Sequence, residues 1–205
     1  CHMLKTIRYF YLLPREWCTR FYVYFNRWIL KLLGVKYGYN VKIFNKFYLL
    51  KHLSASVMLG DNFTFSSGDC FNPLSRNVRG SIYVGKNAKV SIGNNVGASS
   101  ACIWAANSIT IGDNVKIGSD SIILDTDCHS LDYIKRRNPV TDIGNSAPIN
   151  IEDDVLIGTR CVILKGVTIG TRTIIGSGSV VTKSIPSDCI AAGNPCKVIK
   201  RIEIN

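Results

Sequence analysis

The chain has 205 residues, of which 46% are hydrophobic and 19% charged, and its formal net charge is +11. This composition is typical of a globular protein and excludes a disordered or strongly acidic chain. The excess charge is local, because residues 1–52 hold ten lysine and arginine residues against Glu16 alone, a net charge of +9.

Eight cysteines show neither a CxxC pair nor a regular spacing, and several lie in apolar runs. We interpret them as free thiols of a protein in a reducing, cytoplasmic compartment. Residues 1–3 look like the remnant of an expression tag. No apolar run reaches the roughly 18 residues that a membrane span needs, and no signal peptide is visible.

Residues 4–52 are aromatic and basic. Between Arg15 and Leu33 the aromatic residues recur at steps of three and four, which predicts a helix that stops at Gly34. Two interpretations stay open and are compatible: the aromatic face caps the main domain, or the basic face contacts an anionic membrane as a peripheral helix. We therefore divide the chain into an N-terminal segment, 1–56, and a main domain, 57–202.

The main domain carries an internal repeat of six residues. β-Branched residues occupy every sixth position without a gap, and small or β-branched residues follow four positions later in most repeats. The β-branched residues at every sixth position form two runs: Ile111, Ile117 and Ile123, and then Ile151, Ile157, Ile163, Ile169, Ile175 and Val181. A period of six fits neither a helix nor a two-sided strand, and it also disagrees with the turn spacing of a β-sandwich.

A coil of triangular cross-section satisfies this period. Each hexad forms one short flat strand, the apolar residue points into the prism, and the small residue fits near its corner. Stacked coils then bury one aliphatic column through parallel strand pairing. Residues 131–147 interrupt the hexads, so we expect a loop that projects from the prism at about 130–147.

The segment "PINIEDDVLIGTRCVILKGVTIGTRTIIGSGSVVTKSIPSDCIAAGNPCKVIKRI", residues 148–202, resembles the hexapeptide-repeat acetyltransferases. It is most similar to their galactoside, maltose, streptogramin and polysaccharide O-acetyltransferase branch. The resemblance implies an all-β solenoid, a left-handed parallel β-helix. It also implies a homotrimer with active sites between subunits and acetyl-coenzyme A as the donor.

In that branch the catalytic histidine follows an "IGDNV" coil, and "IGDNVKIGSDSIILDTDCHSLD" puts His129 at the matching position. Acetyl transfer to a hydroxyl needs a base, and neutral imidazole suits that task near pH 7. A carboxylate can hold its second nitrogen in the right tautomer. Spacing does not decide which one does so. We assign catalysis to His129 and Asp127, and substrate contacts to Asp125, Asp132, Arg136 and Asp142.

The resemblance also implies a coenzyme A site. Its predicted residues are Thr159, Ser177, Thr182, Lys183, Lys197 and Lys200. The chain departs from the family at three places: Leu156 replaces the usual Trp, Glu152 replaces Gly, and 98–100 read Ala-Ser-Ser where the family has Asn-x-Asn. The acceptor contacts of the family therefore do not transfer.

A metal site of the three-histidine kind is excluded by counting, because the chain has only His2, His52 and His129. We expect an O-acetyltransferase for a sugar hydroxyl, in bacterial surface polysaccharide synthesis, and no nucleic-acid partner. The alternatives are an N-acetyltransferase of a nucleotide-linked amino sugar, a streptogramin-type acetyltransferase and, last, a scaffold without catalysis.

Overall fold

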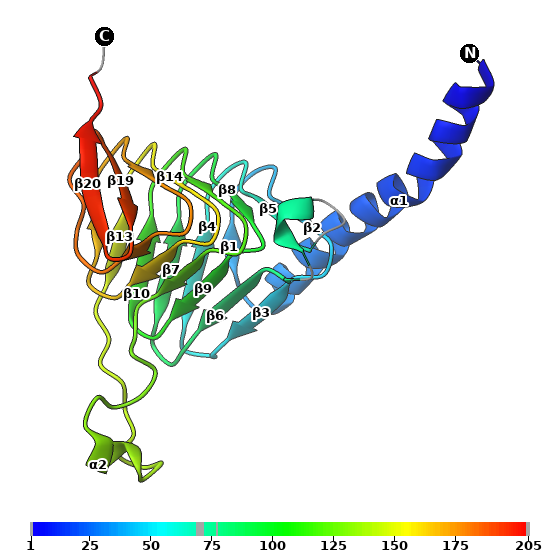
Figure 1. Cartoon of the computed structure of the whole chain (residues 1–205). Coiled ribbons are helices and arrows are strands. Elements are labelled where there is room, and N and C mark those ends of the chain that lie inside the picture. Colours follow the sequence, from blue (N-terminus) through cyan, green and yellow to red (C-terminus); the bar gives the residue numbers. More distant parts are fainter. Residues whose placement is uncertain (1, 69–71, 77, 204–205) are drawn as a thin grey trace.

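A computed structural model describes residues 2–68, 72–76 and 78–203, and within the first helix it describes side chains at position 13 and from position 16 onward. The chain opens with helix α1 (His2–Leu32) and then winds into a prism with three sheets as its sides (Figure 1). We number the sheets I, II and III in the order in which the chain enters them. Each turn of the chain adds one strand to each sheet in that order, as the hexads predict.

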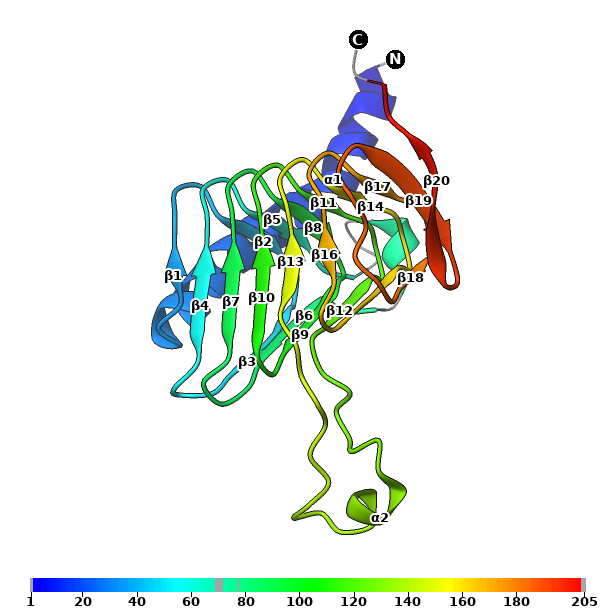
Figure 2. The ribbon, with the colours of Figure 1, turned by 90° about the vertical axis from the view of Figure 1, so that its left-hand side faces the viewer.

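The strands of sheet I lie side by side in Figure 2. They are β1 (Lys36–Tyr37), β4 (Ser56–Leu59), β7 (Lys89–Ile92), β10 (Ser108–Ile111), β13 (Ile149–Ile151) and β16 (Thr168–Ile169). Sheet II consists of β2 (Lys42–Phe44), β5 (Thr64–Ser66), β8 (Gly97–Ser99), β11 (Lys116–Ile117), β14 (Leu156–Ile157), β17 (Ile174–Ile175), β19 (Cys189–Gly193) and β20 (Cys196–Arg201). Sheet III consists of β3 (Tyr48–Lys51), β6 (Ser81–Val84), β9 (Cys102–Ala105), β12 (Ile122–Leu124), β15 (Val162–Leu164) and β18 (Val180–Val181).

The hexad residues form the interior of the prism. Ile123, Ile151 and Ile163 are fully buried, and small residues such as Ser121 and Ser179 are buried at the corners. Apart from the final pair β19–β20, which is antiparallel, the strands pair in parallel register, for example Ile123 opposite Ile163. Pairing therefore stacks identical positions of successive repeats, which confirms the predicted left-handed parallel β-helix.

The β-helix begins earlier than predicted. β1, β2 and β3 pair in parallel with β4, β5 and β6, so the first coil lies within residues 36–51 and the boundary at residue 57 is wrong. The signal was present in the sequence, because Val35, Val41 and Phe47 are six residues apart and are buried or partly buried in the core. The many aromatic residues around them obscured it.

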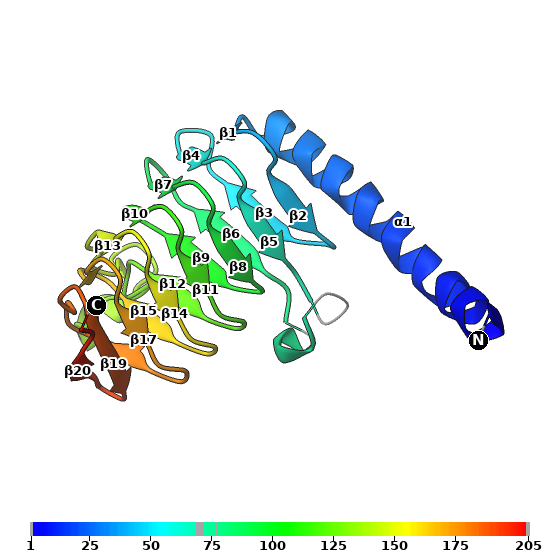
Figure 3. The same cartoon turned by 90° about the horizontal axis from the view of Figure 1, so that it is seen from above.

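Helix α1 closes the end of the prism beside the first coil (Figure 3). The side that faces the prism carries Leu30, which is buried, and Asn26, whose Nδ2 donates to the carbonyl oxygens of Ile43 and Asn45. Arg27 Nε donates to Val41 O. The cap is therefore present, but the prediction that the aromatic face makes it is wrong: those rings lie on the outer side.

Two insertions leave the prism. The first carries the 3-10 turn η1 (Pro73–Ser75) between sheets II and III. The second runs from Asp125 to Pro148 between β12 and β13 and carries α2 (Tyr133–Arg136) at its tip. Figure 2 shows this second loop projecting far from the prism, as the break in the hexads predicts. It leaves from the corner between sheets III and I.

Candidate active site

The neck of the projecting loop is fixed to the prism by backbone hydrogen bonds. Ala147 N donates to Asp125 O at 3.0 Å, and Asp127 N donates to Asn145 O at 2.9 Å. The side chain of Asp125 is fully buried and accepts from the backbone N–H groups of Ala106 (2.6 Å) and Asn107 (2.8 Å). Burial raises the pKa of this carboxyl. Asp125 is a structural residue, and its predicted contact with substrate is wrong.

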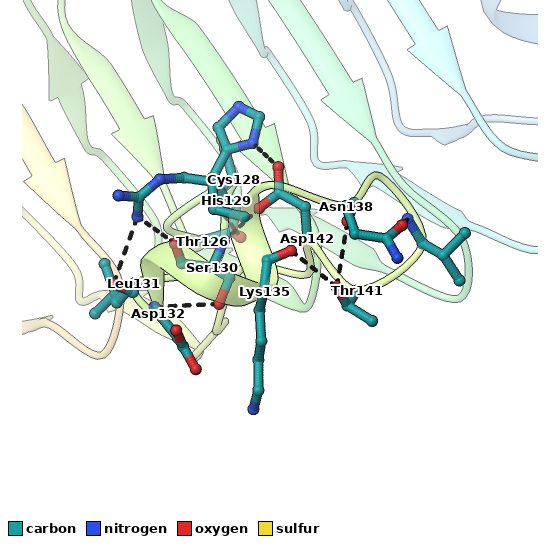
Figure 4. Close-up of polar contacts among 12 residues, drawn as sticks. Thr126, Cys128, His129, Ser130, Leu131, Asp132, Lys135, Asn138, Thr141 and Asp142 are labelled. Carbon is teal, nitrogen blue, oxygen red and sulfur yellow. Dashed lines mark hydrogen bonds and ion pairs between the residues drawn. The ribbon is translucent and has the colours of Figure 1, made fainter.

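His129 lies beyond the neck, with its side chain 69% exposed (Figure 4). Its Nδ1 is 2.6 Å from Oδ2 of Asp142, and the other oxygen of that carboxylate accepts from Ser130 N at 2.7 Å. The Ser130 N–H group and then the His129 imidazole hold the pKa of Asp142 below its usual value. An ionised Asp142 accepts a hydrogen bond from the Nδ1–H group and leaves Nε2 as the basic nitrogen.

The backbone around His129 is tightly held. Cys128 adopts a left-handed conformation with φ 62°, and its N–H donates to Thr126 Oγ1 at 3.0 Å. His129 N then donates to Asp127 O at 2.7 Å. Gly144 lies against this turn: a Cβ at that position would come 2.7 Å from the backbone of Cys128. Only glycine allows the two sides of the loop to approach so closely.

Asp127 does not contact the imidazole, contrary to its assignment to catalysis beside His129; of the carboxylates that spacing left open, Asp142 is the one bonded to Nδ1. The Oδ2 atom of Asp127 lies 3.4 Å from Lys165 Nζ, a residue that the sequence analysis did not single out. Lys165 follows β15, one coil beyond the strand from which the loop leaves. This ion pair ties the neck of the loop to the next coil.

Two other predicted substrate residues have tasks inside the loop. Asp132 is the N-cap of α2, and its Oδ1 accepts from Ile134 N at 2.9 Å. Arg136 Nη1 donates to Ser130 O at 2.6 Å, which fastens α2 to the residue after His129. Both side chains belong to exposed residues, and their contact with a substrate stays a prediction.

The predicted coenzyme residues fall at separate places. Thr159 and Ser177 lie at the corner between sheets II and III, where Ser177 Oγ accepts from Thr159 N, and they line a groove of about 470 Å³ on sheet II. Thr182 and Lys183 are exposed just after β18, at the corner between sheets III and I. Lys197 and Lys200 are exposed on β20. Sheet III thus separates the Thr159 corner from the corner of Lys183 and His129.

Within the described ranges, no group of three or more His, Cys, Asp or Glu side chains could hold a metal ion. The same part of the chain contains no helix long and apolar enough to cross a membrane. Its cysteines, at positions 18, 102, 128, 161, 189 and 196, are free thiols in the structure.

The chain is similar to known proteins of one family. Residues 148–183 match the family model described as bacterial transferase hexapeptide (six repeats). Galactoside O-acetyltransferase of Escherichia coli is 39% identical over 122 residues, which are 59% of this chain and 58% of that protein. The chain spans 44%, 58% and 31% of the first three curated relatives that it matches.

Two solved structures are similar in fold and sequence. A galactoside acetyltransferase in complex with coenzyme A has 28% identity and a TM-score of 0.54, over 82% of this chain and 65% of that one. A maltose O-acetyltransferase of Clostridium difficile 630 has 29% identity and a TM-score of 0.53, over 93% of this chain and 87% of that one.

Proposed function

This chain belongs to the hexapeptide-repeat acetyltransferase family, and from that premise we propose that it transfers the acetyl group of acetyl-coenzyme A to a sugar hydroxyl, with His129 as the general base. The observation that carries the proposal is the bond between His129 Nδ1 and Asp142 Oδ2 at 2.6 Å. The other oxygen of the same carboxylate is fixed by Ser130 N–H, so Asp142 cannot rotate freely. The basic nitrogen Nε2 is left for the substrate.

The chemistry follows from that arrangement. Nε2 of His129 takes the proton of the acceptor hydroxyl while the hydroxyl oxygen attacks the thioester carbonyl. The carbon–sulfur bond then breaks, and the thiolate of coenzyme A leaves and receives the proton from the imidazolium. Ionised Asp142 stabilises the imidazolium between the two steps.

The donor site that we propose uses Thr159 and Ser177 at one corner and Lys183, Lys197 and Lys200 as cations for the phosphates. The groove beside Thr159 and the exposure of the three lysines support it. A point charge on a flexible stem suits a phosphate group at the mouth of a groove. Because Thr159 and Lys183 lie on opposite edges of sheet III, one chain alone does not join all these residues.

A homotrimer would join them, and the outer face of sheet III supports that part of the proposal. Its outward side chains are apolar and partly exposed: Tyr48 is 56%, Leu50 45% and Trp104 37% exposed. The rings of Tyr83 and Trp104 stack with centroids 4.1 Å apart. An apolar face of this kind fits contact between copies, which would bring the His129 corner of one copy to the Thr159 corner of the next.

The test is a thiol-release assay with acetyl-coenzyme A over a panel of sugars, amino sugars and streptogramins. We expect turnover with a sugar hydroxyl, and a loss of about a hundredfold or more in His129→Ala, the usual scale for a general base. Coenzyme A should still bind to that variant in calorimetry. A His129→Ala enzyme with ordinary turnover would overturn the assignment.

The shared site has its own test, in which Thr159→Trp blocks the groove. A refolded equal mixture of His129→Ala and Thr159→Trp chains should recover about a quarter of wild-type activity if each site takes one corner from each of two copies. If the site lies within one chain, every site of the mixture carries a defect and the mixture stays inactive. We place the reaction in the cytoplasm, in keeping with the free thiols.

A further inference from the structure

The outer side of helix α1 carries a row of large apolar side chains that the fold does not use. We call it the aromatic stripe; it consists of Trp17, Phe21, Tyr24, Phe25, Trp28 and Leu32. These residues are separated by steps of three and four, so they share one side of the helix. Trp17 is 72%, Tyr24 70% and Leu32 67% exposed. The buried residues Asn26 and Leu30 mark the opposite side, which faces the prism.

The stripe is continuous. The rings of Phe21 and Phe25 stack with centroids 5.7 Å apart, and Phe25 is followed by Trp28 at 6.1 Å. Single exposed apolar residues are ordinary, but a contiguous exposed patch of this kind marks a contact surface. The cap of the prism does not need it, because Leu30 and Asn26 already close that end. Figures 1 and 3 show α1 extending beyond the first coil.

One flank of the stripe is basic. Arg20 and Lys31 are exposed and lie, at 100° per residue, within about 100° of the centre of the stripe. Glu16 is the single acidic residue of the first 52, against ten lysine and arginine residues. A face that pairs exposed indole and phenol rings with unmatched positive charge fits the headgroup region of an anionic bilayer, where aromatic rings and cations both find partners.

We infer that α1 lies in the surface of an anionic phospholipid membrane, with the aromatic stripe in the headgroup region and Arg20 and Lys31 on the phosphates. A second copy of the chain is the other occupant to consider. Pairing two stripes would bring their basic flanks together, and the first 52 residues offer only Glu16 to offset the repulsion. The charge therefore favours lipid. This inference does not depend on the reaction that the protein catalyses.

The experiment measures flotation of the full chain with two kinds of vesicle. We expect binding to vesicles of phosphatidylglycerol and phosphatidylethanolamine at low salt, and weak binding to phosphatidylcholine alone. Each cation near the surface contributes about a fivefold increase in partitioning at low salt. Half-molar salt should weaken binding strongly, because charges at the surface are then screened within a few ångströms.

Two double variants separate the contributions. Trp17→Ala with Trp28→Ala should lower partitioning by about tenfold or more for each indole, with salt dependence retained. Arg20→Gln with Lys31→Gln should lower it by about fivefold for each charge, and only at low salt. Arg27 is left intact because its Nε bonds to Val41 O. The matched control is Lys86→Gln with Lys89→Gln, which removes the same charge from exposed positions on the prism and should bind as wild type.

Tryptophan fluorescence identifies the surface in contact. The chain has three tryptophans, of which Trp17 and Trp28 lie on the stripe and Trp104 lies on sheet III. Brominated lipid should quench the fluorescence of Trp104→Phe strongly and leave that of the double variant Trp17→Phe, Trp28→Phe nearly unchanged. The inference is overturned if anionic vesicles do not bind, if the Lys86/Lys89 control loses binding equally, or if the alanine variants change only the oligomeric state.

Discussion

The contact between His129 and Asp142 predicts an effect of Asp142→Asn that differs from a simple loss of charge. Asp142 accepts two hydrogen bonds with its two oxygens, from His129 Nδ1 and from Ser130 N. Asparagine keeps only one acceptor. The Ser130 N–H group is fixed by the backbone and always a donor, so it takes the remaining oxygen, and the new amide N–H groups face the imidazole.

The imidazole then keeps its proton on Nε2, the nitrogen that has to accept the substrate proton. We expect turnover to fall by about a hundredfold or more, as for His129→Ala, because an imidazole held in the wrong tautomer no longer acts as the base. The Michaelis constant for acetyl-coenzyme A should stay unchanged, because the proposed contacts with coenzyme A are made by other residues. The assay is thiol release with the acceptor found in the panel, together with calorimetry of coenzyme A binding.

A matched control is Asp120→Asn. It removes a carboxylate next to Arg160 (3.6 Å), and residue 120 has a left-handed backbone, φ 61°, that asparagine adopts readily. This variant should keep wild-type turnover. If Asp142→Asn also keeps it, or if its loss consists only of a raised Michaelis constant, the orientation of His129 by Asp142 is refuted.

Four further outcomes are expected. Lys183→Ala should raise the Michaelis constant for acetyl-coenzyme A with little change in turnover, since its charge contact is the same in ground and transition states; unchanged coenzyme affinity at low salt would contradict this. Asp125→Asn places an amide N–H opposite one of the two backbone donors. The lost hydrogen bond costs about 1–3 kcal/mol of folding free energy, so the melting temperature should fall by several degrees. Gly144→Ala should push the Cys128 turn aside and cost about tenfold or more in turnover, with coenzyme binding and melting temperature nearly unchanged. The pKa of Asp142 is lowered in the folded protein, so this carboxylate stabilises the loop above the ordinary carboxyl pKa near 4. The stabilisation is lost as the pH falls through the lowered pKa. Limited proteolysis of the loop between pH 6 and pH 3 measures the loss, and Asp142→Asn should make the cleavage rate less dependent on pH.

The hexads predicted the prism because every coil repeats one geometry. Ile151, Ile157 and Ile163 are buried for the same reason, and the parallel register keeps identical positions in one column. A sequence pattern carries such information well, since the same inward position recurs in every repeat. The same logic failed at the first coil only because aromatic residues between Val35 and Phe47 hide the period.

Helix α1 shows what a pattern leaves undecided. An apolar stripe at helical spacing normally marks the side that faces the core. Here the core side is marked by Asn26 and Leu30 instead, and Asn26 is buried because it satisfies two carbonyl groups of the first coil. A buried asparagine gives no signal in a hydrophobicity pattern, so the sequence assigned the wrong face.

The site was predictable in part for a similar reason. His129 was found because it follows a recognisable coil, whereas its partner Asp142 is thirteen residues away, across a loop with no period. Spacing alone did not decide among the carboxylates, which include the nearer Asp125 and Asp127. In the fold they are the neck of the loop, with one carboxylate buried under the coil and the other beside Lys165.

The position of His129 depends on that neck. The interior of the prism is filled by aliphatic side chains, so reactive groups can lie only at its corners, on its faces or on insertions. An insertion is free to move unless its base is fixed, and here Asp125 fixes it by bonding to two N–H groups of the coil beneath. Asp142 and Arg136 then hold His129 and Ser130 within the loop itself. The proposed base is therefore carried by a unit that projects from the prism and keeps its internal geometry through these contacts.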